Sequence, residues 1–419
     1  MNTTLSPAVR LLVFSLVAVW YGAAPEAADP EWRTWRGPQQ DGQAQSAELP
    51  IKWGPENVVW RTELPGRGQS SPVLSGDRIF LTSALDNGRS RVVMCVDRRS
   101  GKILWQQTVW TGEPEPSHNM NGWASATCAT DGTRVFAFFG KGGGLSAWSV
   151  DGEKLWQKDL GIFEGPWGTA AAPMVYRNLV IQNGDADADA FIAAFDAATG
   201  DEVWRTKRDD ARGWSSPIVI QVDGHDEVVV NGDTGVRAYD PLSGKELWYC
   251  KSFSGRGTPT VTPAAGLLHT VCGLRGDTYA VRPGGHGDVT ESHMAWHSPR
   301  NTSRDLPSPI VLGNQSLIMD MRRATLTSYD ITTGKELWRR RLADAGTTGQ
   351  FCATPVAWQN TAFFVSETGS TFAVRAGEDM EVVAVNKVNS KEDEIFRSSI
   401  TPDNDRIYLR SDRALYCIR

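Results

Sequence analysis

The apolar positions of this chain fall in short runs that are separated by turn-forming residues. Three examples, each five residues long, are 78–82, 92–96 and 135–139. Runs of this length, bounded by Gly, Asp, Asn or Ser, are typical of β-strands. The pattern therefore predicts an all-β protein.

A nine-residue phrase recurs, with Asp first, Ser or Thr followed by Gly in the middle, and Trp last. It occurs at 97–105, 196–204, 240–248 and 330–338. Such a turn, followed by an apolar residue and Trp, indicates a β-hairpin whose second strand buries a large aromatic ring. With weaker copies included, the repeat residues are Asp97, Asp196, Asp240, Asp330, Trp60, Trp105, Trp156, Trp204, Trp248, Trp296 and Trp338.

The spacing of these Trp residues identifies the kind of repeat. Successive steps are 45, 51, 48, 44, 48 and 42 residues. Repeats of this length indicate propeller blades or solenoid units. We expect the repeated indole rings to pack between neighbouring blades, where burial of a large aromatic ring stabilises the fold.

A second pattern marks the start of each unit, where a small residue, usually followed by Pro, leads into an apolar strand. Clear copies lie at 71–73, 172–174, 216–218, 258–260, 308–310 and 354–356, and looser copies at 126–128 and 398–402. Eight markers predict eight blades, each with four antiparallel strands in the order A, B, C, D.

The two ends of the repeat region complement each other. Residues 58–62 form a D strand with no C strand before it, and residues 415–419 form a C strand with no D strand after it. Pairing the two closes a ring and removes exposed sheet edges, which would invite aggregation. The sequence therefore predicts an eight-bladed β-propeller closed by its N- and C-terminal strands, and an open array of β units is the alternative.

The first 28 residues have the features of an export signal. Arg10 precedes an apolar run at 11–24, and small residues follow through Ala28. The run is too short to span a bilayer comfortably, contains no twin Arg and is not followed by Cys. We therefore expect export by the general secretory route to the periplasm or the exterior, as a soluble protein that is not a lipoprotein. The predicted parts are a signal peptide (1–28), a lead-in segment (29–56) and a single propeller domain (57–419).

Composition limits the partners and the disulfides. Residues 1–28 hold one Arg and one Glu, so the net charge of −6 survives their removal, which disfavours nucleic acid and anionic lipid. No later segment is apolar enough to be an integral membrane span. Cys95 and Cys417 are the best-placed pair for a disulfide, but the lack of paired spacing among the six Cys favours buried free thiols.

The repeated phrase resembles the tryptophan-docking repeat of the pyrroloquinoline quinone (PQQ) propeller superfamily, most closely at 196–206 and 330–339. The opening residues 32–42 and the closing residues 415–418 resemble exported bacterial PQQ-like repeat proteins. That superfamily contains quinoprotein dehydrogenases, the propeller lipoprotein of the outer-membrane β-barrel assembly machinery and exported members of unknown role. The resemblance implies the fold, and it does not choose among these functions.

Aromatic and guanidinium groups gather before the strand A markers. In a propeller, the connections from D to the next A strand and from B to C emerge on one face around the central funnel. Rims rich in Trp and Arg are typical of binding hot spots. The candidate rim residues are Arg67, Gln69, His118, Asn121, Trp123, Trp167, Arg212, Trp214, Arg256, Arg304 and Phe351. The alternative is that they fill the wide hole of an eight-bladed ring.

Two clusters could bind metal. Asp185, Asp187 and Asp189 alternate in a B to C connection, and grouped carboxylates suit Ca²⁺, although solvated turn residues are the default interpretation. His286, Glu291, His293 and His297 lie in the degenerate hairpin of the fifth blade, but on a strand residues 293 and 297 lie about 13 Å apart, too far for one zinc ion.

The resemblance to dehydrogenases implies PQQ in the funnel, between a Trp floor and a disulfide of adjacent Cys, with Ca²⁺ on carboxylate and amide oxygens and an Asp as base. This chain has no adjacent Cys, and its short units leave no large insertions to wall the funnel. We therefore interpret it as an exported, non-catalytic propeller that binds a protein or an envelope polymer without a cofactor. A dehydrogenase that uses PQQ and calcium to oxidise alcohols or sugars is the alternative.

Overall fold

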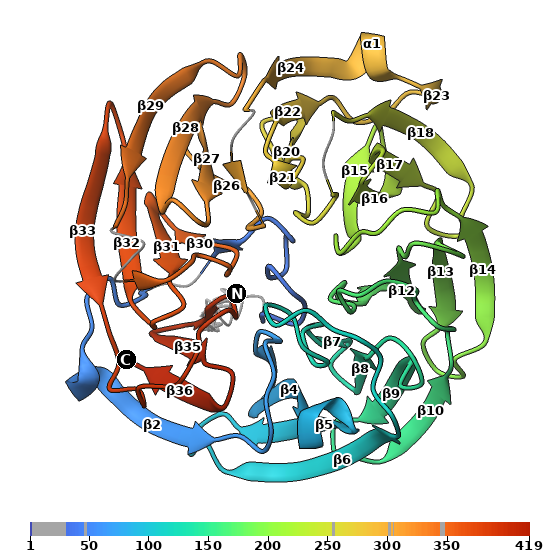
Figure 1. Ribbon diagram of the computed structural model, residues 1–419, viewed down its shortest axis with the longest axis vertical. Helices are drawn as coiled ribbons and strands as arrows, with labels where there is room; N and C mark the ends of the chain where they lie inside the picture. The colour runs from blue at the N-terminus through green and yellow to red at the C-terminus, as the bar shows by residue number, and fades with distance from the viewer. Residues whose placement is uncertain (2–30, 46–47, 254–255, 301–302, 305, 344–347) are drawn as a thin grey trace.

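The computed structural model describes residues 1, 31–45, 48–253, 256–300, 303–304, 306–343 and 348–419. Apart from Met1, the expected signal peptide lies outside the described residues. Across the described ranges, eight sheets of four antiparallel strands form a ring, and Figure 1 looks down its axis. The predicted eight-bladed β-propeller is confirmed.

Each blade runs from an inner strand to an outer strand at the circumference. The first four blades consist of β3 (Val73–Ser75), β4 (Arg78–Leu85), β5 (Ser90–Asp97) and β6 (Ile103–Thr111); β7 (Ala129–Thr130), β8 (Arg134–Phe138), β9 (Leu145–Ser149) and β10 (Lys154–Lys158); β11 (Met174–Tyr176), β12 (Leu179–Gly184), β13 (Phe191–Asp196) and β14 (Glu202–Lys207); and β15 (Ile218–Val222), β16 (His225–Gly232), β17 (Gly235–Tyr239) and β18 (Glu246–Lys251).

The second half of the ring repeats this arrangement. Its blades consist of β19 (Thr262–Ala264), β20 (Leu267–Val271), β22 (Thr278–Val281) and β24 (Met294–Ser298); β26 (Ile310–Leu312), β27 (Gln315–Asp320), β28 (Thr325–Asp330) and β29 (Glu336–Arg341); β30 (Val356–Trp358), β31 (Thr361–Val365), β32 (Thr371–Ala376) and β33 (Met380–Asn386); and β34 (Thr401–Asp403), β35 (Arg406–Arg410), β36 (Ala414–Ile418) and β2 (Val58–Glu63).

A few short elements lie outside the repeated pattern. They are β1 (Gln43–Ala44), which pairs in parallel with β30, the small sheet of β21 (Leu274–Arg275) and β25 (Ser303–Arg304), β23 (Gly287–Asp288), the 3-10 helices η1 (Pro55–Asn57) and η2 (Asp86–Gly88), and the helix α1 (Thr290–His293).

The last blade closes the ring. Strand β2 pairs with β36 in antiparallel register, with Arg61 opposite Tyr416 and Thr62 opposite Leu415. Beside this pairing, the Arg61 guanidinium lies 2.6 Å from the Glu394 carboxylate, and the Tyr416 hydroxyl donates to the same carboxylate at 2.7 Å. The predicted closure by the N- and C-terminal strands is confirmed.

The repeated phrase forms the hairpin between the third and fourth strands of a blade. In the third blade, the Gly200 N–H donates to the Asp196 carbonyl, and the Thr199 N–H donates to the Asp196 carboxylate at 3.0 Å. The Thr199 bond, with a second from the Ala198 N–H, stabilises the charged carboxylate and lowers the pKa of Asp196. The turn places a β-bulge between Ala194 and Phe195.

Most of the repeated Trp residues contact the hairpin of the next blade. The Trp156 indole N–H donates to the Ala197 carbonyl at 3.1 Å, and a Cβ on Gly200 would lie 2.6 Å from the same ring. Equivalent indole bonds join Trp105 to Val150, Trp204 to Pro241, Trp296 to Ile331 and Trp338 to Gly377. The hairpin glycine therefore makes room for the aromatic ring.

The degenerate hairpin of the fifth blade departs from this pattern. It folds over the outer edge of the fourth blade, where β23 pairs in parallel with β18, and the Trp248 indole donates to the Glu227 carboxylate of its own blade at 2.8 Å. His297 stacks on Phe253 with ring centroids 3.4 Å apart. Among the described residues, no three His, Cys, Asp or Glu side chains form a metal-binding group, so the zinc hypothesis finds no support.

All six cysteines are free thiols, so the Cys95–Cys417 disulfide that the sequence left open is not formed. Five of them are buried, and burial raises the pKa of Cys95, Cys128 and Cys250 to about 12. A thiol with so high a pKa is a poor nucleophile, which favours a packing role for these residues.

Candidate binding funnel

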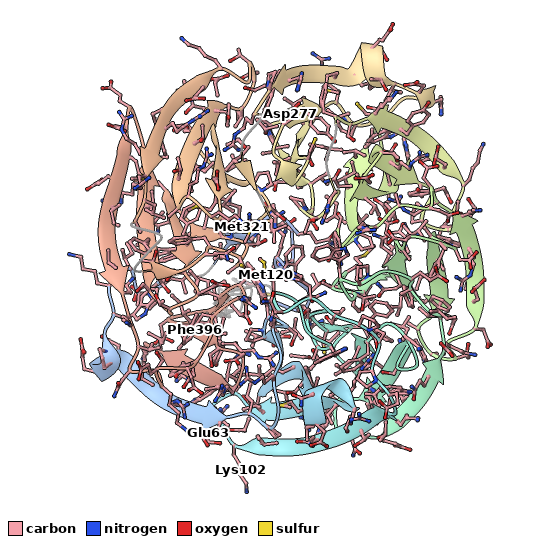
Figure 2. All side chains as sticks on the ribbon, viewed as in Figure 1. Glu63, Lys102, Met120, Asp277, Met321 and Phe396 are labelled. Atoms are coloured by element: carbon pink, nitrogen blue, oxygen red, sulfur yellow. The ribbon has the colours of Figure 1, made fainter. Side chains whose placement is uncertain are left out.

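A cavity of about 220 Å³ opens on the axis of the ring. Apart from Trp35, every described residue that lines it belongs to a connection from the outer strand of one blade to the inner strand of the next. The lining residues are Trp35, Gln69, Ser71, His118, Met120, Asn121, Ser125, Thr127, Trp167, Ala170, Ala172, Trp214, Ser216, Arg256, Thr258, Leu306, Cys352, Thr354, Arg397 and Ser399. Figure 2 shows Met120 near the middle of the ring, whereas Glu63 and Lys102 lie at its circumference.

A belt of hydrogen bonds between blades supports the cavity wall. The Ser399 N–H donates to the Ser71 hydroxyl at 3.1 Å, and the Ser71 N–H donates to the Thr127 hydroxyl at 2.9 Å. On the other side of the axis, Ala172 donates to Ser216 and Ser308 donates to Thr354 in the same way. The small residues at the starts of these blades therefore join neighbouring blades, and most of them border the funnel.

The lead-in segment closes the inner end of the cavity. The segment crosses the channel and is held by two backbone hydrogen bonds. The Leu74 N–H donates to the Trp32 carbonyl, and the Ala357 N–H donates to the Gly42 carbonyl. Arg36 at its centre is 2% exposed and donates to the Thr262 hydroxyl at 2.9 Å and to backbone carbonyls, and burial lowers its pKa to about 10. The Arg36 guanidinium lies 5.9 Å from the centroid of the neighbouring Trp35 ring, which lines the funnel.

Three side chains contact one another on one wall. The Trp167 ring contacts His118, tilted by 38° at a centroid distance of 4.7 Å, and the Arg256 guanidinium lies 5.1 Å from the Trp167 centroid. The Asn121 amide fixes the same connection by donating to the Trp167 carbonyl at 2.8 Å. The Trp214 indole donates to the Gly168 carbonyl at 2.8 Å, which leaves its ring to line the cavity.

The opposite wall contains an ion pair and a thiol. The Arg397 guanidinium contacts the Glu367 carboxylate at 2.7 Å and donates to the Asn119 carbonyl at 2.8 Å. The Cys352 thiol lies 3.6 Å from the same carboxylate. Burial, with the Glu367 charge as a smaller cause, raises the pKa of Cys352 to about 12, so it is a protonated thiol at neutral pH.

Six of the eleven predicted rim residues line this cavity: Gln69, His118, Asn121, Trp167, Trp214 and Arg256. Four of the other five lie elsewhere. Arg67 pairs with Asp412 at 3.3 Å, Trp123 covers Gly88 and donates to the Glu115 carbonyl, and Arg212 binds Asp187. Arg304 lies in β25, and its side chain is outside the described part of the chain.

One predicted rim residue, Phe351, lies in the hydrophobic core and not at the funnel. Its side chain is 1% exposed and packs on Phe372 with ring centroids 5.7 Å apart, so it belongs to the hydrophobic core of the sixth and seventh blades. The next residue along the chain, Cys352, lines the cavity instead. Neighbouring residues of an extended segment point in opposite directions, which explains the exchange.

Two carboxylates of the predicted calcium cluster have arginine partners in the structure. Asp185 is paired with Arg208 at 2.6 Å and Asp187 with Arg212 at 2.6 Å, while Asp189 occupies a turn with φ of 54°. The part of the chain that the structure describes holds no group of three metal ligands here. The charges of Asp185 and Asp187 are therefore neutralised by arginine.

Sequence reasoning missed four notable lining residues: Trp35, Met120, Cys352 and Arg397. Arg397 directly precedes the looser marker at 398–402, so the rule that found Arg256 could have found it. Trp35 carried no such signal, because it lies outside the repeats and reaches the funnel through the lead-in segment.

A protein-family model described as outer membrane protein assembly factor BamB matches residues 88–265 and 286–419. The matched segments include most of the propeller. The chain belongs to this family of PQQ-like propellers. The unmatched residues 266–285 include the start of the degenerate hairpin in the fifth blade. No curated protein sequence matches the chain.

Solved structures with the same fold come from both functional branches. BamB from Moraxella catarrhalis is 16% identical, with a TM-score of 0.61 over 86% of this chain and 96% of that chain. A europium-containing methanol dehydrogenase is 12% identical, with a TM-score of 0.63 over 93% and 98%. The quinohemoprotein alcohol dehydrogenase from Comamonas testosteroni is 12% identical, with a TM-score of 0.66 over 93% and 80%. Likeness at these identities establishes the fold alone.

Within the described ranges, no helix has the length and apolar character needed to cross a membrane. The longest helical element of these ranges, α1, has four residues.

Proposed function

We propose that this chain is an exported, non-catalytic binding protein of the cell envelope whose funnel holds a protein or envelope-polymer partner. The observation that carries the proposal is the make-up of the funnel wall. Trp35, Trp167, Trp214 and Arg256 converge there, and none of the described lining residues is Asp or Glu. Aromatic and arginine side chains in a concave site are typical of binding hot spots.

The dehydrogenase alternative requires a calcium ion and a base beside the quinone. Calcium prefers carboxylate oxygens, and proton abstraction needs a positioned side chain of suitable pKa. Among the described lining residues, the side-chain oxygens are the hydroxyls and the amides of Gln69 and Asn121. The described lining residues therefore do not fit a PQQ–calcium centre, which favours the binding function.

The envelope location rests on the leader. Residues 11–24 form an apolar run behind Arg10, and the family model that matches this chain carries the name of an outer membrane assembly factor. Both features support export to the envelope, where protein assemblies and cell-wall polymers are the available partners. Detection of the mature protein in a periplasmic fraction, with its N-terminus sequenced, would test the location and the cleavage after about residue 28.

Partner capture tests the binding function directly. The purified protein, immobilised, should retain partners from envelope extracts, whereas the triple variant Trp167→Ala, Trp214→Ala, Arg256→Ala should lose at least about 90% of that signal, since anchor residues dominate binding. The melting temperature should change by only a few degrees, because these side chains line a cavity and lie outside the blade cores.

A matched control changes three exposed residues at the circumference: Leu104→Ala, Leu155→Ala and Val203→Ala. This variant should capture partners as the unmodified protein does. Unchanged capture by the funnel variant would contradict the proposal, and so would quinone absorbance with dye reduction after addition of PQQ and calcium.

A further inference from the structure

The hydroxyl groups at the funnel wall have unused hydrogen-bond donors. Ser71, Thr127, Ser216 and Thr354 each accept a backbone N–H from the neighbouring blade. Their side chains are more than nine-tenths buried, yet they line the cavity. Within the described ranges, none of the four hydroxyl protons has a protein acceptor, so each can point into the funnel.

Ser399 and Trp167 add two further donors. The Ser399 side chain also lines the cavity, at 6% exposure, and its hydroxyl makes no hydrogen bond to any described residue. The buried Trp167 indole N–H likewise lacks an acceptor in the described part of the chain. The unpartnered Trp167 donor is costly to bury, and the Ser399 hydroxyl is free to donate to a ligand that supplies acceptors.

The charges around the cavity agree with the donor pattern. Two arginines line it, and no Asp or Glu is found among the lining residues that the structure describes. Arg397 is neutralised by Glu367, but no described carboxylate lies within ion-pair distance of Arg256, whose guanidinium rests on the Trp167 ring. Arg256 therefore makes no direct ion pair with a described carboxylate, and Asp233, the carboxylate that its charge influences, does not line the cavity.

We propose, building on the binding function above, that the funnel captures an acidic peptide segment of a protein partner, with one carboxylate inserted among these donors. An ionised carboxylate only accepts hydrogen bonds and attracts the Arg256 guanidinium, so it satisfies both features at once. The Trp35 and Trp214 rings line the same cavity and cover an aromatic or apolar side chain beside the carboxylate.

Other ligand classes fit the wall less well. A cation would face Arg256 and find no carboxylate among the described lining residues. A sugar carries no charge and so gains nothing from Arg256, whose positive charge an ionised carboxylate complements. The cavity volume of about 220 Å³ accommodates one inserted side chain and not a folded segment.

Calorimetric titration tests the proposal with defined probes. The capped peptide Gly-Phe-Glu-Phe-Gly should bind, and its Gln analogue should bind at least about tenfold more weakly because it lacks the charge. Glutarate and chitobiose serve as the free-carboxylate and sugar probes. The peptide should bind more tightly than glutarate, since its aromatic rings contact the Trp walls, and chitobiose should not compete.

Two variants locate the bound carboxylate. Arg256→Gln should weaken binding of the Glu peptide by about tenfold or more and reduce its salt dependence. Ser399→Ala should weaken it by a few-fold with no loss of stability, because the Ser399 backbone bond to Ser71 remains. Arg212→Gln is the matched control, since Arg212 pairs with Asp187 outside the cavity lining, and it should bind the peptide normally.

Each contrary result overturns the inference. Equal affinity for the Glu and Gln peptides, absence of peptide binding, glutarate binding as tightly as the peptide, or preference for chitobiose would each exclude an acidic peptide as the ligand. If peptide binding fails while the funnel triple variant still loses its partners, the binding function stands and only this inference fails. If the triple variant still captures partners and Arg256→Gln still binds the peptide normally, both the binding function and this inference fail.

Discussion

Burial changes the acid–base behaviour of individual side chains in this ring. His269 in β20 is fully buried, and burial lowers its pKa to about 4. An exposed histidine titrates near pH 6.5. The unfolded chain therefore binds a proton more readily than the folded chain, and protonation favours unfolding.

The free energy of unfolding should consequently fall as the pH drops from about 6.5 to about 4, by roughly 3 kcal/mol in total for this residue. The variant His269→Leu should lose that part of the pH dependence, because it has no group to titrate. Urea denaturation at pH 7 and pH 4.5 measures the effect. His286→Leu, at an exposed position, should keep the original dependence, and an unchanged slope in His269→Leu would disprove the explanation.

At the scale of elements, the hairpin glycine connects sequence to packing. Gly200 has φ of +73°, a conformation that L-residues avoid, and a Cβ there would lie 2.6 Å from the Trp156 ring of the preceding blade. Gly76, in the turn between β3 and β4, has φ of +55° and open space around its Cα. A comparison of substitutions at Gly200 and Gly76 therefore distinguishes the cost of backbone strain from the cost of steric overlap with an aromatic ring.

Gly200→Ala should therefore destabilise the protein by about 3 kcal/mol, from backbone strain and displacement of the indole. Gly76→Ala should cost only about 1 kcal/mol, since it suffers the strain alone. Chemical denaturation of both variants provides the comparison. Equal losses would mean that the Trp156 ring moves aside freely, contrary to the close packing seen here.

Local sequence predicted the repeated elements well. The Asp, Gly and Trp of each phrase lie within nine residues, so the hairpin is encoded by contacts between near neighbours. The parallel pairings of β1 with β30 and β23 with β18 were not predicted. Each joins a two-residue strand to a partner from another unit, and so short a strand has no recognisable pattern of its own.

At the scale of the whole molecule, the lead-in segment ties distant blades together. Arg36 donates to the Val261 carbonyl, the Thr262 hydroxyl and the Pro309 carbonyl, which belong to the fifth and sixth blades. It is 2% exposed, so its replacement would remove the Arg36 donor from the Val261 and Asp41 carbonyls, whereas the Pro309 carbonyl keeps the Thr262 hydroxyl as a donor. The lead-in segment therefore stabilises the ring and also closes one end of the funnel.

Arg36→Ala should lower the free energy of unfolding by about 2–4 kcal/mol, from lost hydrogen bonds and unsatisfied buried carbonyls. Scanning calorimetry and urea denaturation should show the loss. Arg33→Ala, three residues earlier, removes an exposed side chain that pairs with Glu31 and should change stability by less than about 1 kcal/mol. A comparable loss in both variants would indicate that the segment lacks a specific anchor at Arg36.

The candidate site was only partly accessible from sequence. The rule that residues before each strand A marker share one face brought together Trp167, Trp214 and Arg256, because the blades repeat in register. The same rule could not separate Phe351 from Cys352, since a single residue step reverses the direction of a side chain in an extended segment.

By itself, the sequence determined the number of blades, their strand order and the joining of the chain ends, since each depends on a periodic pattern or on complementary terminal strands. Only the tertiary structure decided that Trp35 ends the funnel, that Asp187 pairs with Arg212, and that the free hydroxyl donors converge. Those contacts join residues from different units and depend on distances across the ring, which no local pattern encodes.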